Sequence, residues 1–336
     1  MNSKRLDYID IAKAFAIILV VFGHAAFDRN DRIIRLIYSF HVPVFFILYG
    51  FVVKIPQSSP TFKETAVKSF KRYLVPYFWM MVLCGGFNLE KAADYLNVRQ
   101  SVLVKYEPMA SWFLPCFFLS VIIYALIVKA GCRLHERKKQ ILFIAGCSML
   151  FLAAGLRLSA KRVQDAWMYY NISFTGVGLI AVGLLLRQAW DAVKADALSP
   201  LPAFGFCLIS AGVLAYSAFS NGFTAMVLGS YGNKALFLIS SIAGTCFLLM
   251  LSKSILIKKS DTPPPILSFL GKNSIVVMIF HHLGFEPVLP VLAAFGIERG
   301  AMQGRLLMTL CACLFTGGLA YVINTHFPFI IGKGKN

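Results

Sequence analysis

RLDYIDIAKAFAIILVVFGH, residues 5–24, leads into an apolar run that carries the ionisable side chains of Lys13 and His24. A helix needs about 20 apolar residues to cross the hydrocarbon core of a bilayer, and residues 9–27 supply them. Lys4 and Arg5 precede the run, as basic residues precede the apolar part of a signal peptide. Lys13, His24 and the lack of a persuasive cleavage site argue against removal of this segment. The run therefore predicts a retained first transmembrane helix.

Apolar runs of similar length recur along the 336-residue chain, which is 58% hydrophobic and only 14% charged. Together they predict an all-α, polytopic integral membrane protein with about ten transmembrane helices. The expected spans are residues 9–27, 33–53, 74–88, 111–130, 141–157, 172–188, 201–219, 235–252, 274–295 and 305–326. The third and fifth spans are short, so tilting or flanking amphipathic turns would have to extend them. No long soluble domain fits between two spans, which predicts a single transmembrane domain over residues 1–336.

The formal net charge of +18 comes from basic residues in short loops between the apolar runs. Basic residues in such loops tend to stay on the cytoplasmic side. Most of the lysines and arginines fall on that side if both termini are cytoplasmic, so we expect this orientation. These residues form no basic face interleaved with aromatic side chains, which argues against nucleic acid as a partner. The eight cysteines show no CxxC pair or metal-ligand spacing, so we expect neither a disulfide framework nor a metal site.

Ionisable side chains within the spans are the functional candidates, because they are costly in lipid and tend to face the protein interior. Five of the six histidines lie in or at the end of an expected span: His24, His41, His281, His282 and His326. His24 follows Lys13 by eleven residues, which places both on nearly the same helix face, about 16 Å apart along the axis. Lys13 would lie near the cytoplasmic end, with Asp10 one turn earlier as its partner.

His41 lies in SFHVPVFF, residues 39–46, where the second span descends from the outer side to a depth similar to that of His24. The two histidines are therefore expected to converge near the outer third of the membrane. Pro43 has no N–H, so the carbonyl one turn earlier needs a donor from neighbouring protein or water. His281 and His282 are adjacent on a helix and point apart, so at most one ring is expected to line the same cavity.

Each candidate also has a purely structural interpretation. A lone lysine in a span, such as Lys13, is most often a snorkelling anchor, and Trp112 has the ordinary position of an interfacial belt residue. A hydrogen-bonded packing role competes for His24 and His41. Two deep histidines in adjacent helices nevertheless favour a functional role.

Several segments carry a family resemblance. They are RLDYIDIAK and ILVVFGH (residues 5–13 and 18–24), SFHVPVFF (39–46), RYLVPY (72–77), WFLP (112–115) and LGKNS (270–274), the last followed by His281. In this order they resemble the membrane acyltransferase family 3 of bacterial O-acetyltransferases, in particular its fucose 4-O-acetylase-like branch. Lys13 replaces the commoner arginine of that family, and a lysine lacks the bidentate guanidinium fork.

The resemblance implies a membrane O-acyltransferase of the bacterial inner membrane. Such an enzyme transfers an acetyl group from cytoplasmic acetyl-CoA to a hydroxyl of a sugar, polysaccharide or lipid-linked glycan, without a metal. His24 would be the general base, and His41 would orient it or share the proton. The expected donor and substrate site comprises Lys13, Asp10, Lys71, Arg72, Trp112, Asn273, Ser274 and His281. A histidine that carries the acyl group covalently is the alternative mechanism.

The main alternative function is a secondary transporter or flippase that moves a sugar or lipid-linked intermediate through the same polar cavity. Repeated halves with paired discontinuous helices would favour it, and the sequence contains no convincing internal repeat. The acceptor, the acyl chain and the oligomeric state are left open by the sequence.

Overall fold

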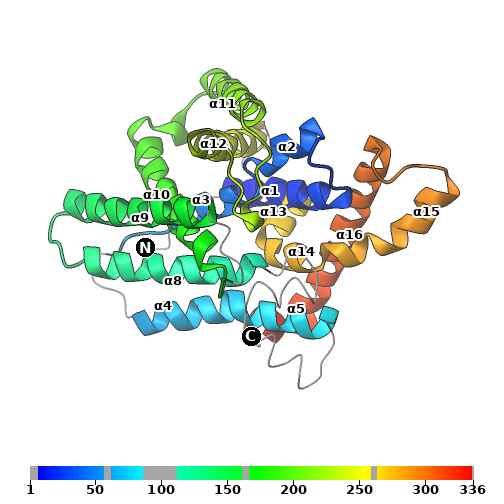
Figure 1. Cartoon of the computed structure of the whole chain (residues 1–336), viewed down its shortest axis with the longest axis horizontal. Helices are drawn as coiled ribbons and strands as arrows, with labels where there is room; N and C mark the ends of the chain where they lie inside the picture. The colour runs from blue at the N-terminus through cyan, green and yellow to red at the C-terminus, as the bar shows by residue number, and fades with distance from the viewer. Residues whose placement is uncertain (1–6, 57–61, 86–111, 161–165, 259–262, 335–336) are drawn as a thin grey trace. The chain divides into compact units, whose positions relative to one another are not determined.

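The computed structural model describes residues 7–56, 62–85, 112–160, 166–258 and 263–334 (Figure 1). Within these residues the chain is helical, and an isolated antiparallel bridge joins Ala225 to Ser230. The α-helices are α1 (Asp7–Ala25), α2 (Arg32–Tyr38), α3 (Pro43–Val52), α4 (Phe62–Ser69), α5 (Val75–Gly85), α8 (Phe113–Gly131), α9 (Arg137–Ala160), α10 (Tyr170–Ala192), α11 (Pro200–Ser220), α12 (Lys234–Lys258), α13 (Pro265–Lys272), α14 (Ser274–Phe280), α15 (Leu289–Ala294) and α16 (Met302–His326). The shorter helical turns are η1 (Phe70–Leu74), η3 (Ala195–Ala197), η4 (Met226–Leu228), η5 (His281–Gly284), η6 (Glu286–Val288) and η7 (Pro328–Ile331).

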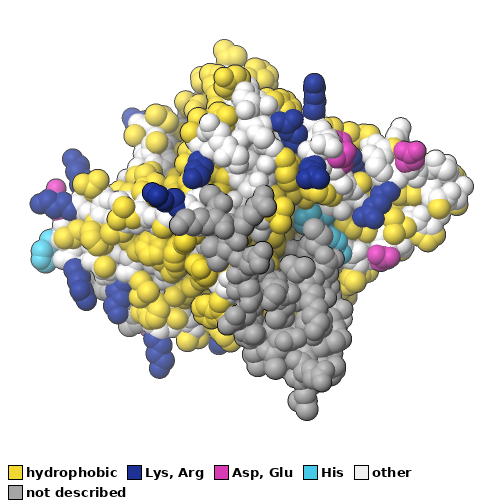
Figure 2. Space-filling view, viewed as in Figure 1, with side chains coloured by type: hydrophobic (Ala, Val, Ile, Leu, Met, Phe, Trp, Pro, Cys, Tyr) yellow, Lys and Arg dark blue, Asp and Glu magenta, His cyan; other side chains and the backbone are white. Residues whose placement is uncertain are grey.

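Nine helical stretches among the described residues are long and apolar enough to cross a membrane. They are Asp7–Ala25, Arg32–Val52, Phe113–Gly131, Arg137–Ser159, Tyr170–Ala192, Pro200–Ser220, Lys234–Leu256, Ser274–Ala294 and Met302–His326. Large apolar side chains on them, such as Leu142, Leu201 and Leu314, are exposed, and hydrophobic atoms cover much of the face seen in Figure 2. The prediction of an all-α, polytopic membrane protein is confirmed. The cytoplasmic location of both termini stays a prediction.

The expected third span, residues 74–88, is the one that differs. The chain there runs as helix from α4 through η1 into α5, and residues beyond Gly85 lie outside the described part. The described part of α5 has 11 residues, so the expected span is described only in part. The helical turns before it carry charged side chains, so this stretch is not among the nine. The short fifth span, by contrast, becomes a helix of 24 residues, α9.

The packing of the chain divides it into two compact units. Unit 1 comprises Met1–Phe45, Trp190–Thr224 and Tyr231–Val322, and unit 2 comprises Phe46–Ala189, Ala225–Ser230 and Ile323–Asn336. The single domain expected from the sequence stays a prediction.

In unit 1, α1 lies against α12 and α13 (Figure 1). Small side chains allow this approach: Ala12, Ala14 and Ala16 of α1 are fully buried. At Gly271 of α13, a Cβ atom would overlap the carbonyl oxygen of Asp10, so the two backbones touch there. Close helix contact through small residues is the usual way in which membrane helices associate. It fixes the start of α1 against the end of α13.

In unit 2, α3 and α10 cross with the same kind of close contact. A Cβ at Gly50 would overlap the carbonyl oxygen of Ile180, and one at Gly183 would overlap that of Ile47. The helix α8 packs against α9 and against η1 within the same unit.

Candidate active site

The first helix carries an ion pair near its start. Asp10 and Lys13 are one turn apart, and the Lys13 Nζ lies 3.6 Å from the Asp10 Oδ1. The Asp10 side chain is buried, whereas that of Lys13 is partly exposed. The pair expected from the spacing is therefore confirmed.

At the other end of α1, His24 is hydrogen-bonded to His281. The His24 Nδ1 and the His281 Nε2 are 2.8 Å apart. The ring centroids are 5.0 Å apart and the ring planes are inclined by 26°. With so short a nitrogen separation, this centroid distance means that the rings meet edge to edge. The bond therefore lies close to both ring planes, where imidazole lone pairs and N–H bonds point.

His282 also reaches His24, which the sequence did not predict. Its ring centroid lies 5.3 Å from that of His24 and 4.2 Å from that of His281. The expectation that only one ring could line the site was wrong because the α-helix does not continue through these residues. It ends at Phe280, whose φ and ψ of −109° and 2° are not α-helical, and His281 begins the tighter turn η5. The spacing of about 100° between α-helical side chains therefore does not describe His281 and His282.

His41 occupies a break in the second span. The helix α2 ends at Tyr38 and α3 starts at Pro43, so His41 lies in the turn between them. The His41 ring is buried, and its Nδ1 lies 2.8 Å from the carbonyl oxygen of Ile37, which can only accept a hydrogen bond. The proline leaves the carbonyl of Ser39 without its helical donor. The Ser240 hydroxyl lies 3.2 Å from this oxygen, so neighbouring protein satisfies it as expected.

Tyr38 separates His24 from His41. Its ring centroid is 4.6 Å from that of His41 and 6.5 Å from that of His24. The two histidines therefore flank a tyrosine instead of touching. Tyr38 was not among the residues predicted from the sequence, because a tyrosine in a membrane-spanning helix is ordinarily an interfacial residue. The only available signal was its position three residues before His41.

Asn273 and Ser274 join α13 to α14. The Asn273 side chain is nine-tenths buried, and its Nδ2 donates to the carbonyl of Phe269 at 2.9 Å. Its own carbonyl accepts from the amides of Val276 and Val277, which starts the next helix. This junction follows Gly271 directly, so it lies near the Asp10 end of α1.

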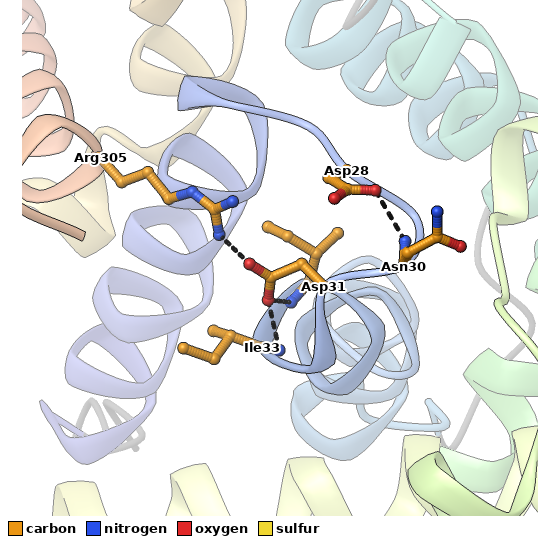
Figure 3. Close-up of polar contacts among 6 residues, drawn as sticks. Asp28, Asn30, Asp31, Ile33 and Arg305 are labelled. Carbon is orange, nitrogen blue, oxygen red and sulfur yellow. Dashed lines mark hydrogen bonds and ion pairs between the residues drawn. The ribbon is translucent and has the colours of Figure 1, made fainter. Parts of the chain in front are cut away.

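Two arginines hold the loop that leaves α1 after His24. The Nε of Arg299 donates to the carbonyl of Ala25 at 2.6 Å. Asp31 caps α2 by accepting from the amides of Ile33 and Ile34, and its other carboxylate oxygen lies 2.6 Å from the Nη1 of Arg305. Figure 3 shows the contacts of Asp31, with Arg305 reaching its carboxylate from another helix.

The pKa of the Asp31 carboxyl is held below its ordinary value of 3.8. Partial burial alone would raise this pKa, but the hydrogen bonds from Arg305 and from the amides of Ile34 and Ile33 outweigh burial. Asp31 is therefore an anion in the folded protein at neutral pH.

Lys71, Arg72 and Trp112 belong to unit 2. Lys71 and Arg72 are exposed in the π-helical turn η1, and the Arg72 guanidinium lies over the Tyr73 ring at 5.7 Å from its centroid. Trp112 is buried, with its ring centroid 5.9 Å from those of Phe113 and Tyr169. Their participation in one site with the residues of unit 1 stays a prediction.

His24, His281 and His282 could in principle form a metal site, since a ring nitrogen of each lies within 4.8 Å of the others. The geometry favours a hydrogen bond instead. Two nitrogens bound to one tetrahedral zinc ion at 2.0–2.1 Å would lie about 3.3 Å apart, further than the 2.8 Å observed between His24 and His281. These two nitrogens also point at each other and not at a common third position.

The comparisons with known proteins agree with the sequence resemblance. A family model described as an acyltransferase domain matches residues 6–325 of the chain. The protein is thus an acyltransferase embedded in a membrane by several helices. The chain belongs to the acyltransferase family 3. No curated protein and no solved structure matches it.

Proposed function

We propose that this chain is an O-acetyltransferase of the bacterial inner membrane. It transfers an acetyl group from cytoplasmic acetyl-CoA to a hydroxyl of a sugar, polysaccharide or lipid-linked glycan, as members of its fucose 4-O-acetylase-like branch do. The observation that carries the proposal is the 2.8 Å hydrogen bond with His281, which orients the His24 ring within a membrane helix. A hydroxyl is a weak nucleophile, and a positioned imidazole is the side chain best suited to remove its proton near neutral pH.

In the proposed reaction, His24 takes the proton of the acceptor hydroxyl as the hydroxyl oxygen attacks the thioester carbonyl. The new C–O bond forms and the C–S bond breaks. The proton returns from His24 to the leaving sulfur, so the products are an ester and free CoA. His41 supports this step through the Tyr38 ring that lies between the two histidines.

The donor would bind at the opposite end of α1. Lys13, paired with Asp10, supplies a positive charge for the CoA phosphates, together with Lys71 and Arg72. Asn273 and Ser274 offer hydrogen bonds near Asp10, and Trp112 walls the acyl pocket. Lys13 and His24 are eleven residues apart on one helix, about 16 Å along its axis, a distance that the extended pantetheine arm of CoA can bridge.

The test is to incubate the purified protein in detergent with radiolabelled acetyl-CoA and candidate glycan acceptors. We expect thioester consumption that depends on the acceptor, and we expect His24→Ala to abolish it while leaving expression and membrane insertion unchanged. Normal acetylation by a well-expressed His24→Ala protein would remove the catalytic assignment. Binding or movement of the glycan without thioester consumption would instead identify a transporter or flippase.

A covalent acyl-histidine intermediate is the alternative route to the same product. It predicts that label from acetyl-CoA stays on the protein when the acceptor is omitted, whereas direct transfer leaves the protein unlabelled. Acid-quenched protein separated from free acetyl-CoA distinguishes the two routes.

A further inference from the structure

We infer that His281 is the positioning residue that fixes the tautomer of His24, so that the reacting atom of His24 is its Nε2. The inference rests on the proposed function, because it assigns a role within the same site. It follows from a chain of hydrogen bonds that begins at the backbone of α14.

The first link fixes the protonation of His281. Its Nδ1 lies 2.9 Å from the carbonyl oxygen of Met278 and 3.1 Å from that of Val277. Carbonyl oxygens can only accept, so the Nδ1 of His281 carries a hydrogen. These carbonyls are available to a side chain because α14 ends at Phe280, and the last carbonyls of a helix lack some of their intrahelical donors. The His281 ring is fully buried, with no exposed surface.

The second hydrogen bond, between His281 and His24, fixes which nitrogen of His24 carries the hydrogen. In a neutral imidazole one nitrogen carries the hydrogen and the other has the lone pair. The Nε2 of His281 is therefore an acceptor, and the Nδ1 of His24, 2.8 Å away, must be the donor. That leaves the lone pair of His24 on Nε2. The backbone of one helix thus selects the tautomer of a histidine on another.

This arrangement has a chemical consequence for proton removal. When the Nε2 of His24 takes the hydroxyl proton, the ring becomes an imidazolium whose Nδ1–H already points at a lone pair of His281. His281 stabilises that charge without gaining or losing a proton itself. When the proton passes from Nε2 to the leaving sulfur, both rings return to their starting tautomers.

His282 does not share this role. Its ring packs beside both other imidazoles, but its buried Nε2 has no hydrogen-bond partner among the described residues. A ring without a directional contact cannot select a tautomer.

The test compares His281→Gln with His281→Leu. A glutamine can place its side-chain oxygen near the original Nε2 and so still accept from the Nδ1 of His24, whereas leucine removes the acceptor. We expect His281→Leu to lower kcat by about 100-fold or more, with the KM for acetyl-CoA unchanged. We expect His281→Gln to retain activity within about 10-fold of the wild type. His135→Leu removes an exposed histidine in the turn before α9 and serves as the control.

Equal losses in the glutamine and leucine variants, or a loss confined to KM, would overturn the inference. Because either variant could misfold, the wild-type protein gives a second measurement. In 15N-histidine NMR of the protein in micelles, we expect a neutral His24 with its hydrogen on Nδ1; a hydrogen on Nε2 would equally overturn the inference. A wild-type protein without acetyl transfer, but with the expected tautomer, would instead refute the proposed function alone.

Discussion

The Asp31 carboxylate joins two helices, because it caps α2 and accepts the guanidinium of Arg305 at 2.6 Å from α16. The Arg305 side chain is 7% exposed, and that of Asp31 is 24% exposed. Asp31 ends the loop that follows His24, and Arg305 of α16 binds it there. The pair is therefore a structural support of the candidate site.

Loss of the carboxylate charge should destabilise the protein. Asp31→Asn keeps a capping side chain but leaves the buried Arg305 without its counter-charge. We expect a loss of roughly 2 kcal/mol in unfolding free energy, between the values typical of exposed and of buried pairs. Thermal unfolding in detergent measures it. Glu136→Gln, which breaks the exposed Glu136–Lys139 pair, is the matched control and should change little.

The double variant Asp31→Asn/Arg305→Met separates the two causes of that loss. If the unpaired guanidinium is responsible, removing it should restore part of the stability. An equally unstable double variant would show that the cap matters more than the ion pair.

Acid should weaken the ion pair between Asp31 and Arg305. The pKa of Asp31 is lower in the folded protein than its ordinary value of 3.8, so the unfolded chain takes up the proton first. Its contribution to stability is fully present above about pH 4 and is lost as the pH falls through the folded pKa. The melting temperature of the wild type should therefore fall more steeply between about pH 5 and pH 3 than that of Asp31→Asn. Parallel curves for the two proteins would contradict this assignment.

Lys13 should act on the donor and not on the acceptor. We expect Lys13→Met to raise the KM for acetyl-CoA by about 10-fold or more, and Lys13→Arg to retain most of the affinity because the positive charge remains. Acetyl-pantetheine, which lacks the nucleotide phosphates, provides the control substrate. Its KM should be similar in the wild type and in Lys13→Met. An equal rise for both donors would place Lys13 away from the phosphates.

Gly271 should tolerate no side chain. In Gly271→Ala the new Cβ would overlap the carbonyl oxygen of Asp10, which we expect to cost about 1–3 kcal/mol and to lower activity by displacing the Asp10–Lys13 pair. Gly318→Ala on α16 is the control, since a Cβ there meets no atom within 4 Å. Unfolding and transfer assays on both variants test the prediction. A Gly271→Ala protein as stable and active as Gly318→Ala would show that the helices can separate at this point.

Local spacing in the sequence predicted those features that depend on one helix. Nine of the ten spans predicted from the apolar runs match long apolar helices among the described residues, and the three-residue spacing predicted the Asp10–Lys13 pair. The missing N–H of Pro43 predicted that the Ser39 carbonyl needs an outside donor, which proved to be Ser240. Each of these follows from helix geometry and from the cost of unsatisfied polar groups in lipid.

The features that the sequence could not predict depend on where a helix stops and what packs there. The end of α14 at Phe280 brings both His281 and His282 to His24, and no change in hydrophobic periodicity marks it. Tyr38 lies between two histidines because α2 ends at that residue. The third expected span, residues 74–88, stays a prediction, because its last part lies outside the described residues.

The contact between Gly271 and Asp10 has a consequence for the whole site. The α13–α14 segment touches α1 near Asp10 at one end and near His24 at the other, so both ends of the two parallel segments are tied. The number of residues between the two contacts is therefore fixed in each segment, and with it the separation between Lys13 and His24. Inserting a single residue into one segment alone would rotate its later part by about 100° and break one of the two contacts.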